Sequence, residues 1–126
     1  MSEITEYLIT IDVDASGAST DTVGTAIFGQ LYAVDVVNGT LANNFDITLS
    51  YANSQGVSHT LVTFTNLSAD GLYYPRHVVH SEAAAALTGT SGGDRAMPLI
   101  AGTVTAVTAD GGVSKSGALI LYVIED

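Results

Sequence analysis

The chain lacks several residue types that particular functions require. It has no cysteine, which excludes disulfides, zinc–thiolate sites and a thiol nucleophile. Three cationic side chains, Arg76, Arg95 and Lys115, oppose thirteen acids, so the formal net charge is −10. Because general nucleic-acid affinity depends on neutralising phosphates with Lys and Arg, we expect no nucleic-acid partner.

Long apolar runs and targeting signals are also missing. No stretch reaches the roughly 18 to 20 uninterrupted apolar residues that a membrane-spanning helix needs, so we expect no membrane partner. The first residues, MSEITEYLI, carry acids where a secretory signal peptide has a basic segment. We therefore expect synthesis in the cytoplasm without export by the ordinary route.

Apolar residues are abundant instead. They make up 47% of the 126 residues, whereas charged residues make up 13%, about half of the roughly 25% typical of soluble proteins. A chain of this length can bury the core of one domain. It has too few ionic side chains to cover the remaining surface, and surplus apolar surface usually marks an interface. The composition therefore indicates a subunit of an oligomer or larger assembly.

Apolar and polar residues alternate with a period of two over much of the chain, which is the pattern of strands with one buried face. Turns rich in Gly, Asn and Asp separate these segments. The predicted strands are residues 4–13, 25–37, 45–51, 57–67, 99–108 and 116–124. The last of them, GALILYVIE, is apolar on both alternating faces, which is typical of a strand that is central in a sheet or covered by a neighbouring subunit.

The connections complete the predicted fold. Residues 53–56, Asn-Ser-Gln-Gly, indicate the most secure hairpin, and residues 109–112, Ala-Asp-Gly-Gly, indicate another turn. Residues 18–24 are predicted as a loop or ragged edge. Residues 81–87 could form one or two helical turns, because Ser is a good N-cap and Ala the best helix former. We predict one all-β domain over residues 1–126, a sandwich or small barrel of about six to eight antiparallel strands with one long central connection.

One segment matches the opening of a calcium-binding loop. Residues 12–17, Asp-Val-Asp-Ala-Ser-Gly, place oxygen ligands and a glycine at the required spacing. The position that should supply a bidentate glutamate holds Val23, and no flanking helices are predicted. We therefore interpret the segment as a hairpin turn and predict no metal there.

The histidines are the other candidates for chemistry. His77 and His80 are three residues apart, a spacing that makes a shared metal site on a helix but places the side chains on opposite faces of a strand. The surrounding Pro75 and valines favour extended structure, so we expect structural or interface histidines and no cofactor. Ser81 beside His80 does not indicate a catalytic triad, because a triad is recognised by geometry. We predict that the protein is not an enzyme.

Tyrosine and arginine, which are enriched at interface hot spots, cluster around Pro75. They lie in a long connection between strands, the kind of segment that usually carries function. The alternative is that the tyrosines simply pack against the edge of the sandwich. The predicted contacts with neighbouring subunits are Tyr73, Tyr74, Arg76, His77, His80 and Arg95.

Three segments, in this order, resemble small structural proteins of tailed bacteriophages and prophages. They are ITIDVDASGAST at residues 9–20, PRHVVHSEAAAALTGTSGGDRA at residues 75–96, and the GG-x-x-K-S-G turn and strand at residues 111–123. The family pattern has a T-T-D-A-S-G strand and turn, a P-R…H-S…A-A-L…GG segment and a G-G-x-x-K-T-G hairpin. These motifs consist of turns and small residues. They therefore favour a structural component of the virion over any particular location within the virion.

The resemblance implies a capsid decoration (cement) protein on the outer surface of the head. Its partners would be the major capsid protein and neighbouring copies of itself, as a homotrimer that buries the C-terminal strand face and part of residues 73–76. The acidic charge fits this location, because packaged DNA disfavours a protein of charge −10 on the inner surface. The alternatives are a head–tail connector or tail component, and a carbohydrate-binding β-sandwich with stacking faces at Tyr32, Tyr51, Tyr73 and Tyr74.

Overall fold

The computed structural model describes residues 3–78 and 95–125. These residues form ten strands and no helix, which confirms the predicted all-β class. The strands are β1 (Glu3–Asp12), β2 (Ser19–Thr22), β3 (Ile27–Val37), β4 (Phe45–Ala52), β5 (Ser58–Leu67), β6 (Gly71–Tyr73), β7 (His77–Val78), β8 (Arg95–Ala96), β9 (Leu99–Ala109) and β10 (Ser116–Glu125). The helical turns predicted for residues 81–87 lie outside the described residues.

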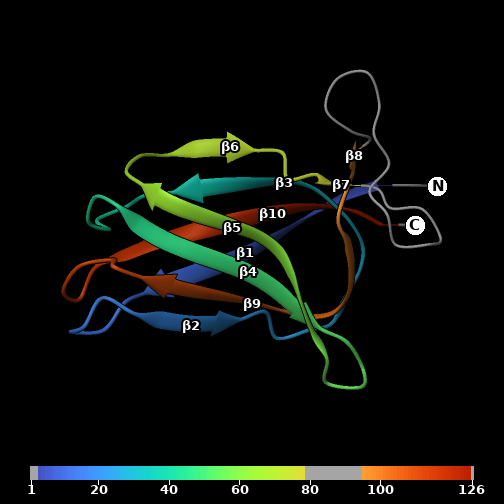
Figure 1. Cartoon of the computed structure of the whole chain (residues 1–126), viewed down its shortest axis with the longest axis horizontal. Coiled ribbons are helices and arrows are strands. Elements are labelled where there is room, and N and C mark those ends of the chain that lie inside the picture. The colour runs from blue at the N-terminus through green and yellow to red at the C-terminus, as the bar shows by residue number, and fades with distance from the viewer. Residues whose placement is uncertain (1–2, 79–94, 126) are drawn as a thin grey trace.

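Eight of the strands join into one antiparallel sheet, which is not closed into a barrel (Figure 1). Its strand order is β1-β10-β3-β9-β4-β5, with β2 paired to β9 and β6 paired to β3. The short strands β7 and β8 form a separate pair. As predicted from its apolar sequence, β10 is central, with β1 on one side and β3 on the other.

The sheet folds over along β9 into two layers. Residues 99–102 of β9 pair with β3, whereas residues 103–109 pair with β4. The change of partner falls at Gly102, where an added Cβ would overlap the carbonyl oxygen of Ala52. We call β1, β10, β3 and β6 the β10 layer, and β5, β4, β9 and β2 the β4 layer.

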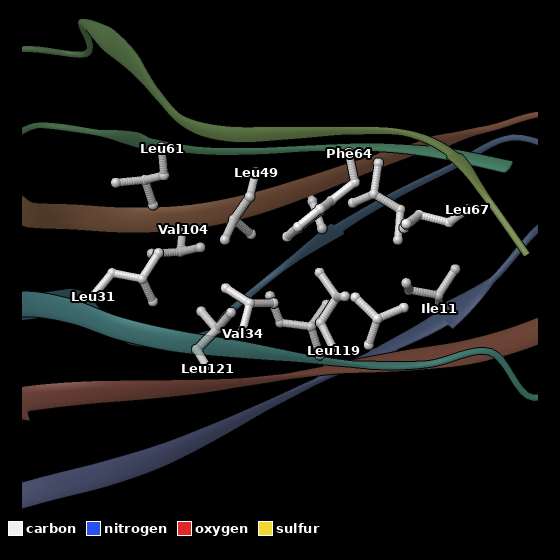
Figure 2. Packing of buried hydrophobic residues seen from close by; sticks show 14 of the residues in the cluster. Ile11, Leu31, Val34, Leu49, Leu61, Phe64, Leu67, Val104, Leu119 and Leu121 are labelled. Atoms are coloured by element: carbon white, nitrogen blue, oxygen red, sulfur yellow. The ribbon is translucent and has the colours of Figure 1, made fainter. Parts of the chain in front are cut away.

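The hydrophobic core lies between the two layers. Figure 2 shows side chains of β4 and β5 meeting those of β3 and β10 in this space. Leu49, Val34, Leu119 and Leu121 are completely buried, and burying one such side chain stabilises the fold by about 1.5–3 kcal/mol. On β1, β4, β9 and β10 the core residues alternate with residues that face outward, as the period of two predicts. On β5 the buried residues Leu61, Phe64 and Leu67 are three apart, because the β4–β5 register shifts along the strand.

Two predicted connections differ from the structure in what they join. The turns at residues 14–17 and 109–112 form, but neither closes a hairpin: β1 pairs with β10 and β2 with β9, and β9 does not pair with β10. Each turn instead carries the chain from one layer to the other. The turn at residues 53–56 does close the β4–β5 hairpin, as predicted.

The segment predicted as a loop or ragged edge contains a short strand. Residues Ser19–Thr22 form β2, which pairs with β9 at one edge of the β4 layer. The strand has no fully buried side chain, so the sequence lacks the apolar alternation by which the longer strands are recognised.

Candidate functional site

The outer faces of the two layers differ in chemistry. The outer face of the β4 layer carries mostly hydroxyl side chains. They include Thr20 and Thr22 of β2, Thr48 and Ser50 of β4, and Thr103 and Thr105 of β9. The outer face of the β10 layer carries a group of neighbouring apolar side chains. We call this surface the apolar face, and it consists of Ile4, Leu8, Leu72, Ile120, Tyr122 and Ile124.

Strand register brings the members of the apolar face together. Ile4 of β1 lies beside Ile124 of β10, and Leu8 lies beside Ile120. Ile4 is 55% exposed and Leu8 is 64% exposed, although both residues belong to a regular strand of the main sheet. Contiguous exposed apolar residues on a sheet mark an interaction surface.

A shallow depression of about 150 Å³ lies on the same side of the molecule. It is lined by Ile4, Tyr32, Ala33, Leu72, Tyr74 and Tyr122. Of these residues, Ala33 is only 2% exposed. The depression therefore connects the apolar face to Tyr74, which directly follows β6 in the chain.

Two carboxylates lie within the apolar face. Glu6 of β1 pairs in register with Tyr122, and Asp35 of β3 pairs with Ile120. Partial burial raises the pKa of the Tyr122 hydroxyl, and the negative charges of Glu6 and Asp35 raise it further. The electrostatic potential here is therefore negative, and a like charge from a partner would be repelled.

Tyr74 and Arg76, both predicted as interface residues, lie together beside Tyr32. The rings of Tyr32 and Tyr74 meet edge to face with centroids 5.7 Å apart. The Arg76 guanidinium donates hydrogen bonds to the Tyr32 and Pro75 carbonyl oxygens, at 3.0 and 2.6 Å, and lies 5.7 Å from the centre of the Tyr32 ring. Contacts within the chain thus hold Arg76 in place, while Tyr74 remains 53% exposed.

The other predicted interface residues lie apart from this cluster. Tyr73 packs on Phe64 of the opposite layer, with ring centroids 5.0 Å apart, and remains 36% exposed. His77 is exposed and its Nε2 atom is hydrogen-bonded to the Leu61 carbonyl oxygen. Arg95 is exposed on β8, opposite Val78. His80 lies outside the described residues.

The candidate metal ligands do not assemble in the described part of the chain. Within residues 3–78 and 95–125, no group of three or more His, Asp or Glu side chains could hold a metal ion. In the calcium-like segment, Asp14 accepts hydrogen bonds from the backbone amides of Ser16 and Ala18, at 2.8 and 3.1 Å. These bonds lower the pKa of the Asp14 carboxyl, and the bond from Ala18 contributes most to the lowering. Ser81 lies outside the described residues.

Sequence reasoning missed half of the apolar face. The prediction assigned an interface role to the C-terminal strand, whose alternate residues Ile120, Tyr122 and Ile124 do lie on this face. It did not include Ile4 and Leu8, because the first strand was recognised from its other, buried face. The sequence does contain a signal for them, because Ile4 and Leu8 are apolar at positions where the other outward-facing residues of that strand are polar.

Comparisons with known proteins give little similarity. No protein-family model and no curated protein matches the chain. Among solved structures, it is similar to a chain of infectious bursal disease virus, Gx strain, with a TM-score of 0.31 and 16% identity over 98% of this chain and 38% of that one. A mutant VP2 protein of the same virus, in derived T=1 particles, gives a TM-score of 0.31 and 16% identity over 97% of this chain and 36% of the other. The chain therefore spans little more than a third of these proteins, and similarity at this level establishes no shared function.

Proposed function

We propose that this protein is a structural component of a bacteriophage virion, specifically a capsid decoration protein that stabilises the head from its outer surface. The observation that carries the proposal is the difference between the two outer faces. One face is apolar and includes the half-exposed Ile4 and Leu8, whereas the other is lined with Thr and Ser. Such a one-sided molecule is suited to lie with one face against a larger protein surface and the other in water.

The binding free energy that one copy can gain from its apolar face is modest, which suits attachment through many linked copies. Burying a fully exposed Leu or Ile side chain contributes about 1.5–3 kcal/mol, so covering the exposed parts of Ile4 and Leu8 would contribute about 1–2 kcal/mol each. A single copy gains a modest affinity from such contacts, because association itself is costly. Copies linked to one another around a symmetry axis would hold the shell by multivalency.

The partners in this proposal are the major capsid protein and neighbouring copies of the chain, which assemble as a homotrimer. We assign the contacts between copies to the segment of Tyr74 and Arg76, whose exposed aromatic ring and fixed guanidinium are typical of an interface anchor. The net charge of −10 supports the outer surface of the capsid over the surface that faces DNA. The resemblance to small virion proteins of tailed phages supports the same assignment.

Purified virions of the phage or prophage that encodes the chain test the proposal. Quantitative mass spectrometry should find the protein at a copy number comparable to that of the major capsid protein, and a reconstruction should place it outside the shell. A copy number typical of a single ring would favour the head–tail connector or tail component instead. Complete absence from the particles would refute the virion assignment.

The carbohydrate-binding alternative gains no support from the arrangement of its tyrosines. Tyr32 and Tyr74 share one cluster, but Tyr51 stacks against His59 on the β4 layer, and Tyr73 packs on Phe64. The four rings therefore do not form one stacking platform. A glycan array with a specific hit would reopen this alternative.

A further inference from the structure

The acids within the apolar face restrict what can cover it. Glu6 and Asp35 flank Tyr122 and the adjoining Ile120, so any partner that covers these residues also covers or approaches two carboxylates. A buried carboxylate without a positively charged or hydrogen-bonding partner is costly. The side chains that cover this face must therefore combine apolar groups with cationic ones.

The chain itself is a poor source of those cations. Symmetric stacking of the apolar face on that of a second copy would bring the carboxylates of both copies together. Arg76, the cationic side chain next to the depression, already donates to two carbonyl oxygens of its own chain and lies by the Tyr32 ring. The remaining cations, Lys115 and Arg95, are on the β9–β10 connection and on β8. Charge complementarity thus favours a different protein over a second copy.

We infer that the apolar face docks a cationic, apolar segment of a partner protein, whose Lys or Arg side chains pair with Glu6 and Asp35 while its apolar side chains cover Ile4, Leu8 and Ile120. In a virion the partner is the shell protein, so the inference rests on the proposed function for its biological setting. The apolar face then points toward the shell, and the Thr- and Ser-rich face of the β4 layer points to solvent.

A synthetic peptide of alternating leucine and lysine tests the chemistry without the shell. Fluorescence anisotropy of the labelled peptide should show binding that weakens with added salt, because exposed ion pairs are screened. Glu6→Gln and Asp35→Asn should each weaken binding by about twofold to fivefold, the range expected for one exposed ion pair. Leu8→Ser should weaken it by roughly tenfold through loss of apolar contact.

Matched controls separate a specific face from general attraction to an acidic protein. Asp110→Asn removes one negative charge from the exposed β9–β10 turn, and Val107→Ser removes an exposed apolar side chain from the opposite layer. Both variants should bind the peptide as the wild type does. If they weaken binding as much as Glu6→Gln and Leu8→Ser do, the attraction is general and the inference is wrong.

Two further outcomes would overturn the inference. A peptide of alternating leucine and glutamate that binds equally well would show that the carboxylates do not select the partner. Sedimentation velocity that shows oligomers of the wild type, and monomers after Leu8→Ser, would assign the face to a second copy. Absence of the protein from virions would remove the proposed function but leave the peptide result unchanged, so the two can fail separately.

Discussion

Replacing Gly102 with alanine should strongly destabilise the protein. Gly102 lies where β9 leaves β3 and begins to pair with β4. Its φ angle is +156°, and a Cβ built on it would overlap the backbone oxygen of Ala52 on the neighbouring strand. No rotamer change can relieve this overlap, because the atom in the way belongs to the backbone.

The expected loss follows from two contributions. Holding a residue other than glycine in this region of φ costs about 1–3 kcal/mol, and forcing packed backbone apart to make room costs typically about 1–3 kcal/mol more. Gly102→Ala should therefore lower the free energy of unfolding by about 2–6 kcal/mol. This is a large part of the roughly 5–15 kcal/mol that stabilises an ordinary domain.

Urea unfolding followed by tyrosine fluorescence and circular dichroism can measure this loss, since the chain has six tyrosines and no tryptophan. Gly24→Ala is the matched control, because nothing lies within 4 Å of a Cβ at that position. We expect the control to be neutral or to stabilise by up to about 1 kcal/mol through the unfolded state. A Gly102→Ala variant as stable as the control would refute the view that the sheet folds over at this residue.

Three further substitutions test the core, the segment that contains Tyr74 and Arg76, and the turn that follows β1. The buried hydroxyl of Thr108 has no hydrogen-bond partner among the described residues, so Thr108→Val should stabilise the protein by about 1–3 kcal/mol. Thr48→Val, on the outer face of β4, should change little in the same unfolding assay. Arg76→Ala should leave the protein folded but weaken its binding to capsids in a co-sedimentation assay, and an unfolded variant would instead assign Arg76 a purely structural role. Because hydrogen bonds lower the folded-state pKa of Asp14 below its usual 3.8, its contribution to stability is present above that pH and is lost as the pH falls through the folded-state pKa. The stability difference between wild type and Asp14→Ala should accordingly be constant near neutral pH and shrink in acid, and a difference that persists in acid would contradict this.

Local sequence predicted the strands well because each long strand has one face in the core. The alternation of Phe45, Ile47 and Leu49 with polar residues follows directly from this one-sided burial. The hairpin at residues 53–56 was equally predictable, since the Asn53 side chain accepts hydrogen bonds from the amides of Gln55 and Val57 within the turn itself. Both signals depend only on residues that are close in sequence.

Strand pairing was not predictable in the same way. Nothing local to residues 109–112 shows that the strands on either side lie in different layers, because a Gly-rich turn serves a hairpin and a crossing equally well. The role of Gly102 depends on Ala52, which is distant in sequence and reaches it only through the β4–β9 pairing. The same holds for Tyr73, whose packing partner Phe64 lies on the other layer.

By itself, the sequence determined the all-β class, most of the strands and the acidic, apolar character of the whole. These properties follow from composition and from periodicity along the chain. Only the tertiary structure decided that Ile4 and Leu8 lie beside Ile120 and Ile124 on one face, since these residues meet through pairing between the two ends of the chain. The tertiary structure also decided that Glu6 and Asp35 lie within that face. Strand register sets which side chains become neighbours, and register depends on two paired strands, so the sequence of one strand does not specify it.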